Sequence, residues 1–133
     1  MLKAEILDAA LGCQRQMYRY LTELSELTAE LGKAAERQDP VSIRMFLKLR
    51  QEPLSRVAEL RRGFRMQCRG LPEEERAHLL ALLNNTAGHV SEEEAPLAKQ
   101  SLQNQNLLER LIAADRQVSL QINRNKSFYR RKR

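Results

Sequence analysis

The chain has 133 residues, a net charge of +6, 42% hydrophobic and 30% charged residues, and only five Gly and four Pro. This length suits one domain with a modest core, and so few turn residues disfavour a multi-stranded sheet. No apolar run reaches the roughly 18 residues of a transmembrane helix, and the N-terminus lacks the pattern of a signal peptide. We therefore expect an all-α protein in the cytoplasm, without membrane insertion.

A heptad pattern marks the first segment. Its apolar or small positions follow steps of four and three residues over about 35 residues, which predicts one long helix with a coiled-coil-like seam. The seam positions are Ile6, Ala10, Cys13, Met17, Tyr20, Leu24, Leu27, Leu31 and Ala34. Asp39 and Pro40 then suit the cap and first turn of a second helix. So short a link makes the two helices an antiparallel hairpin.

The second helix is predicted over residues 40–69. Its expected buried side consists of Ile43, Phe46, Leu47, Leu54, Val57, Phe64 and Cys68. Pro53 lies inside this helix, and we expect a bend there because proline lacks a backbone donor and crowds the carbonyl of Leu49. Gly70 and Pro72 end the helix.

A short helix and a third long helix complete the chain. Residues 72–84 predict the short one, with acidic residues in its first turn. The third begins either at Ser91, which forms a capping-box match with Glu94, or after Pro96. It is expected to end near Asn125, giving one helical domain over residues 1–125 and a basic, flexible tail over 126–133. The predicted fold is an elongated three-helix bundle: an antiparallel coiled-coil-like hairpin, a short helix and a long C-terminal helix.

Candidates for catalysis or metal binding are few. His78 and His89 lack partners at metal-ligand spacing, and the glutamates at 73–75 and 92–94 suit solvated helix starts. Cys13 and Cys68 occupy apolar positions, as reduced, buried thiols do. No glycine-rich phosphate loop or nucleophile motif occurs. We predict a protein that is no enzyme, with no cofactor, no metal and no small-molecule substrate.

Positive charge is concentrated in two segments. Residues 44–69 hold eight basic and two acidic residues, and the tail from residue 124 holds six basic and no acidic residues. Charge and the aromatic Phe128 and Tyr129 could together bind nucleic acid. The candidate contacts are Arg124, Lys126, Arg130, Arg131, Lys132 and Arg133. The ordinary alternative is solvated surface charge and ion pairs that stabilise little.

The last long helix has leucines on both sides. Leu107, Leu111, Ala114, Val118 and Ile122 share one face, with Leu108 and Ile112 on its flank. Leu102 and Leu120 point away from that face, while Ser101, Asn104 and Asp115 fall at seam-like positions. Singly exposed leucines are ordinary, but apolar residues outside the core face would also suit docking of another amphipathic helix.

The order of these segments resembles the FlgN-type flagellar export chaperones. The resemblance is carried by LTAELGKAAERQDPVSIRMFLKLRQEPLSRVAELR (27–61), LPEEERAHLLALL (71–83) and KQSLQNQNLLERLIAADRQVSLQI (99–122). In the last segment Gln103, Asn106 and the pair Leu107–Leu108 follow the family's Asn/Gln-x-x-Asn-x-x-Leu-Leu pattern, slightly shifted. Pro53 and the strongly basic second helix and tail depart from the family.

The resemblance implies a non-catalytic chaperone of the bacterial cytoplasm. Such proteins bind C-terminal helical segments of hook-associated (hook–filament junction) proteins and deliver them to the flagellar type III export apparatus. Clients are engaged largely through the C-terminal helix, so the candidate client-binding residues are Leu102, Leu107, Leu108, Leu111, Ile112, Val118, Leu120 and Ile122. Some of these residues must belong to the core, and the sequence leaves open which ones. Two alternatives belong to other classes: a small basic nucleic-acid-binding protein, and a structural coiled-coil subunit that forms homo-oligomers.

Overall fold

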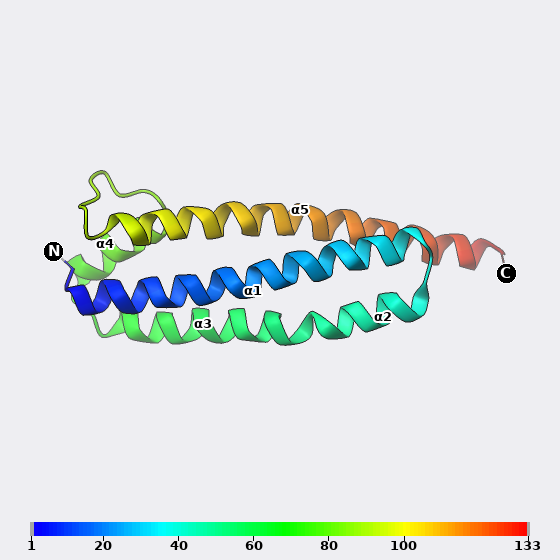
Figure 1. Ribbon diagram of the computed structural model, residues 1–133, viewed down its shortest axis with the longest axis horizontal. Coiled ribbons are helices and arrows are strands. Elements are labelled where there is room, and N and C mark those ends of the chain that lie inside the picture. The colour runs from blue at the N-terminus through cyan, green and yellow to red at the C-terminus, as the bar shows by residue number, and fades with distance from the viewer. Residues whose placement is uncertain (1, 133) are drawn as a thin grey trace.

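The structure is a computed structural model that describes residues 2–132, with side chains as far as Lys126. Its elements are α1 (Ala4–Glu36), α2 (Pro40–Leu49), α3 (Gln51–Arg69), α4 (Glu73–Leu83) and α5 (Ala95–Lys132). Figure 1 shows an elongated bundle in which α1 and α5 run in the same direction while α2 and α3 run back along α1. The predicted all-α bundle is confirmed.

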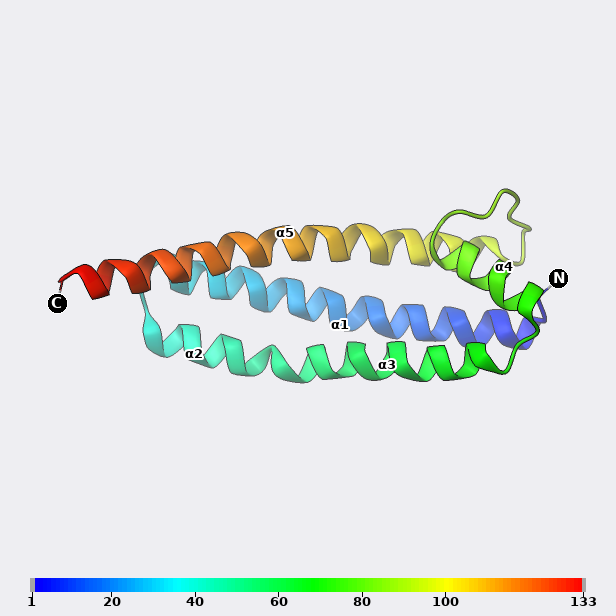
Figure 2. The same ribbon diagram turned by 180° about the vertical axis from the view of Figure 1, so that it is seen from behind.

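The first helix is the central one. α1 packs against α5 on one side and against α2 and α3 on the other, as both views show (Figures 1 and 2). Its 33 residues make a rod of about 50 Å. No helix within the described part of the chain is long and apolar enough to cross a membrane.

About half of the predicted seam positions of α1 are buried. Ala10, Met17, Leu24 and Leu31 are buried as expected, and so is Ala34. The other predicted positions are only half-buried; they are Ile6, Cys13, Tyr20 and Leu27. The residues that follow three of them, Leu7, Leu21 and Thr28, are buried, and Ala35 is buried beside Ala34. A helix with two neighbours needs a wider apolar stripe than the two-position seam of a coiled coil.

The turn after α1 follows the predicted hairpin. Gln38 takes a left-handed conformation with φ of 56°, and the Asp39 N–H donates to the carbonyl of Ala34 at 3.0 Å, which closes the helix in a Schellman-type arrangement. The Asp39 carboxylate then caps α2, accepting from the Ser42 N–H at 3.1 Å and from its hydroxyl at 2.6 Å.

The return helix breaks at Arg50. The bend expected near Pro53 is present as an interruption between α2 and α3, because Pro53 has no N–H to donate to the carbonyl of Leu49. The expected burial is confirmed for Val57 and Cys68. It is wrong for Leu47 and Leu54, whose exposed fractions are 41% and 49%. The remaining three residues, Ile43, Phe46 and Phe64, are half-buried.

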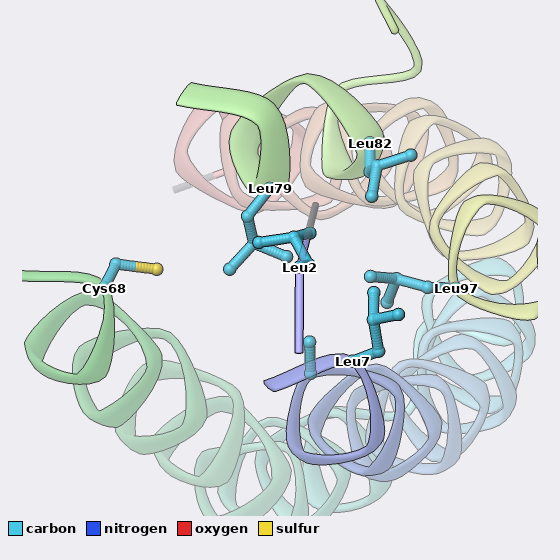
Figure 3. Close-up of a cluster of buried hydrophobic side chains, with 7 residues drawn as sticks. Leu2, Leu7, Cys68, Leu79, Leu82 and Leu97 are labelled. Atoms are coloured by element: carbon cyan, nitrogen blue, oxygen red, sulfur yellow. The ribbon is translucent and has the colours of Figure 1, made fainter. Parts of the chain in front are cut away.

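The predicted short helix α4 closes one end of the bundle. Leu79 and Leu82 point into a cluster shared with the N-terminal residues of the chain, α3 and α5 (Figure 3). The other members of this cluster are Leu2, Leu7, Ala10, Cys68 and Leu97. Leu80, from the same run of leucines, stays 43% exposed.

The last helix begins at Ala95, between the two predicted starts. The capping box does form, since the Ser91 N–H donates to Glu94 Oε1 at 3.1 Å and the Glu94 N–H donates to Ser91 Oγ at 3.3 Å. Pro96 is accommodated in the first turn, where its missing donor is not needed. The expected end near Asn125 is wrong, because α5 continues to Lys132 and takes in residues predicted as a tail.

Candidate functional site

The side of α5 that faces α1 is a heptad seam with polar members. Its positions are Leu97, Ser101, Asn104, Leu108, Leu111, Asp115, Val118, Ile122 and Asn125. Ser101, Asn104 and Asn125 are buried, at 3%, 5% and 9% exposure. This placement confirms that the polar residues lie on the seam. Ala114, which was grouped with the core face, is exposed.

Hydrogen bonds to α1 satisfy two of these polar residues. Asn104 Nδ2 donates to the backbone carbonyl of Gln14 at 2.8 Å and to Gln14 Oε1 at 2.7 Å. Asn125 Nδ2 donates to the carbonyl of Ala35 at 2.9 Å. Both pairs have the same separation of 90 residues, so they fix α1 and α5 in one parallel register.

The eight predicted client-binding residues do not form one surface. Leu111 is buried, and four others are half-buried: Leu107, Leu108, Val118 and Ile122. Leu107, Leu108 and Leu111 pack in the central core with residues of α1 and α3. These three side chains therefore contribute to the core, and Leu107 and Leu108 remain partly exposed.

The remaining three residues are open to solvent. Leu102, Ile112 and Leu120 have exposed fractions of 48%, 45% and 58%. Leu102 and Leu120 are separated by about five helical turns, so they lie on the same side of α5, facing away from α1. The prediction that these two leucines point away from the bundle is confirmed.

A further apolar surface on α2 was not predicted. No residue of α2 is buried, and Val41, Met45 and Leu49 are 69%, 49% and 50% exposed at spacings of four residues. The signal in the sequence is that PVSIRMFLKL has apolar residues around most of the helix, interrupted on one side by Arg44 and Lys48. A helix with one neighbour can bury only one side.

A groove between α3, α4 and α5 was also not predicted. It has a volume of about 470 Å³, and Leu21 and Met17 of α1 form part of its floor. Further apolar lining comes from Phe64, Leu80, Leu83 and Leu108, and polar lining from Arg61, Arg65, Ser101, Asn104 and Gln105. A second groove of about 540 Å³ lies between α1 and α3.

Titratable groups come together at the start of α5. His78 Nε2 lies 2.5 Å from Glu94 Oε2, and Glu94 is only 6% exposed. Burial raises the pKa of this carboxyl, but hydrogen bonds from the Ser91 backbone and from His78 outweigh it, so the net pKa is lowered. His89 is exposed in the loop before α5. Among the described residues, no three His, Cys, Asp or Glu side chains are grouped to hold a metal ion.

The two cysteines are free thiols. Cys68 is buried and Cys13 half-buried, with the Cys13 thiol 3.8 Å from the carbonyl of Leu60. Burial raises the pKa of both thiols, and the neighbouring Cys68 adds to the effect at Cys13. A raised pKa keeps them protonated and poorly nucleophilic near neutral pH.

The candidate nucleic-acid contacts are only partly described. Arg124 and Lys126 are exposed near the end of α5. The side chains of Arg130, Arg131 and Lys132, and all of Arg133, lie outside the described residues. On α3, Arg56 forms exposed ion pairs with Glu59 at 3.4 Å and Glu52 at 3.9 Å. Surface ion pairs of this kind are the alternative to nucleic-acid binding for the basic residues of 44–69.

No family model, curated protein or solved structure matches this chain. The surfaces that stand out on this chain are the exposed leucines of α5, the apolar side of α2 and the arginine-lined groove.

Proposed function

We propose that this protein is a non-catalytic chaperone of the bacterial cytoplasm that serves flagellar type III export. Its clients are hook-associated proteins, whose C-terminal helical segments it binds and keeps unassembled until the export apparatus receives them. The proposal follows the resemblance in the order of the helical segments. One structural observation supports it most, namely the exposed aliphatic residues on the outer side of α5.

The distribution of polarity on α5 is the physical reason. A helix that only had to fold would place its leucines inside and its polar residues outside. In α5, Ser101 and Asn104 are buried while Leu102 and Leu120 are about half exposed. Apolar residues kept in water, on a helix with polar residues in its own seam, suit a surface that a client helix covers.

Replacing both outer leucines by glutamate tests the proposal. Leu102→Glu/Leu120→Glu should leave the helical circular dichroism and thermal midpoint unchanged, because both side chains are already exposed. Affinity for a C-terminal helical segment of a hook-associated protein should fall about tenfold or more, since each leucine loses apolar contact. Isothermal titration calorimetry measures this loss.

The matched control adds the same charge to the same helix. Gln103→Glu/Gln117→Glu changes two exposed residues of α5 that are not apolar, and it should leave client affinity unchanged. Equal affinity for the leucine variant and the unsubstituted protein would contradict the proposal. Loss of folding in the leucine variant would assign both residues to the core.

Two measurements address the alternative classes. A nucleic-acid-binding protein should lose salt-dependent affinity for a generic oligonucleotide when residues 126–133 are deleted. A structural coiled-coil subunit should sediment as an oligomer that fails to survive as a folded monomer on dilution. The chaperone proposal expects neither result.

A further inference from the structure

The groove between α3 and α5 has one basic rim and a largely apolar floor. On the α3 side, Arg61 and Arg65 line it together with Phe64. Neither arginine forms an ion pair with any residue whose side chain the structure describes. The floor beneath them is formed by α1, where Cys13, Met17 and Leu21 are apolar and Gln14 is polar. The two arginines, which have no ion-pair partner among the described side chains, therefore lie beside a groove surface that contains no acidic residue.

Two exposed apolar residues lie beyond the lining of the groove, towards the middle of the bundle. Leu54 lies seven residues, about two turns, before Arg61, and Ile112 lies two turns after Gln105, so each shares the groove side of its helix. These two residues are 49% and 45% exposed. Beyond them, Arg50 Nη2 donates to Asp115 Oδ1 at 2.8 Å and joins the α2–α3 junction to α5. α4 lies at the opposite end, through Leu80 and Leu83.

The dimensions suit a helix of a few turns. Along α5 the lining runs from Ser101 to Leu108, a rise of about 10 Å or two helical turns.

We propose that this groove binds an acidic amphipathic helix of a partner protein. The helix places apolar residues on the floor formed by α1 and on Leu54 and Ile112, and it places carboxylates against Arg61 and Arg65. Charge complementarity selects this occupant, because the chain's own C-terminal segment is basic and would be repelled. A largely apolar floor also disfavours a nucleic-acid backbone, which needs its phosphates solvated or paired.

This site is separate from the outer leucines of α5. Leu102 and Leu120 are not part of the groove lining. The inference therefore does not require that the partner be an export client, and the two proposals can fail independently.

Two designed peptides of about 18 residues serve as probes, a length that lets a helix span the groove. Both carry the same leucine pattern on one face; one has glutamates and the other lysines beside it. We expect the fluorescence anisotropy of the labelled acidic peptide to rise on binding and to fall again as salt is raised to about 0.5 M, because salt screens the charges. The basic peptide should not bind. Equal binding of both peptides, or of neither, would overturn the proposal.

Paired arginine variants locate the binding. Arg61→Ala/Arg65→Ala should weaken binding of the acidic peptide about tenfold, because each exposed ion pair contributes a few-fold. Arg62→Ala/Arg69→Ala removes the same charge from exposed residues of α3 outside the groove and should have little effect. An equal loss of peptide affinity in both variants would indicate attraction by net charge alone and would overturn the proposal that the peptide binds in the groove.

A blocking variant tests the groove without changing charge. Gln105→Trp places a large side chain in the groove and should abolish peptide binding, whereas Gln103→Trp, on an exposed position outside it, should not. Leu102→Glu/Leu120→Glu should leave peptide binding unchanged. Two results would give the groove another occupant and overturn the proposal. One is sedimentation of the protein as a dimer that Gln105→Trp dissociates, and the other is tight binding of a single-stranded oligonucleotide that Gln105→Trp abolishes.

Discussion

Asn104 of α5 and Gln14 of α1 are joined twice, because one side-chain amide donates both to the backbone carbonyl of Gln14 and to its side-chain oxygen, at 2.8 and 2.7 Å. Asn104 is 5% exposed and Gln14 is half-buried, so the pair is largely shielded from water. A buried polar pair of this kind specifies which residues of two helices lie opposite each other, at some expense in stability.

Substituting Asn104 by aspartate should destabilise the bundle strongly. A carboxylate cannot donate, and it would be buried against two oxygens, so we expect the free energy of unfolding to fall by about 2–4 kcal/mol at pH 7. Urea unfolding measures this loss, which should shrink near pH 4 as the carboxyl is protonated. Asn104→Leu, which packs without charge, should change stability by less than about 1.5 kcal/mol. Equal stability of the aspartate variant and the unsubstituted protein would contradict the geometry.

Asn125 should hold the distal part of α5 against the end of α1. Its amide donates to the carbonyl of Ala35 at 2.9 Å, and that carbonyl also accepts from the Gln38 N–H at 3.1 Å. Because the acceptor keeps one partner, Asn125→Ala should lower the free energy of unfolding by only about 1 kcal/mol. Amide exchange in α5 around residue 125 should accelerate. Asn123→Ala, at an exposed position two residues earlier, is the control and should change neither quantity.

Glu94 should make stability depend on pH in the acidic range. Its pKa is lowered in the folded protein, so its contribution is complete above the ordinary value of 4.5 and is lost as the pH falls through the lower folded-state value. Glu94→Gln should therefore be less stable than the unsubstituted protein at pH 7, and the difference should narrow below pH 4.5. Thermal unfolding across this range measures it. A difference that grew on acidification, or an equal effect of the exposed control Glu93→Gln, would contradict the prediction.

Two glycines of α1 should respond differently to alanine. A Cβ at Gly12 would meet nothing within 4 Å, so Gly12→Ala should raise the free energy of unfolding by about 0.5–1 kcal/mol. A Cβ at Gly32 would lie 3.3 Å from Val118 Cγ2 on α5. Gly32→Ala should therefore raise the free energy of unfolding by less than Gly12→Ala does. In a Val118→Ala background, where the contact is removed, the two increases should be equal. Equal gains at both glycines in the unsubstituted background would show that α1 and α5 are not in such close contact.

The architecture was predictable because its signals are local. Asp39 and Pro40 specify a helix start, and Pro53 interrupts a helix wherever its neighbours lie. The side on which α1 is buried was only half predictable. Periodicity finds an apolar stripe but does not say how many helices cover it, so Leu21 and Thr28 were missed while Tyr20 and Leu27 were expected inside.

The candidate surfaces depended on contacts between distant segments. That Leu102 and Leu120 point outwards follows from spacing along one helix, and it was predicted. The sorting of Leu107, Leu108 and Leu111 into the core required the position of α3. The groove beside Arg61 and Arg65 could not be predicted at all, because it exists only where three helices and α4 meet.

The connection between neighbouring helices has a kinetic consequence. α1 and α2 are joined by three residues, whereas α5 reaches its partners on α1 only after closing a loop of 90 residues, as Asn104 and Gln14 show. Loop closure grows more costly with length, so the hairpin should assemble first and α5 should dock last. If α5 were to detach again, the whole α5-facing side of α1 would be open to a competing helix.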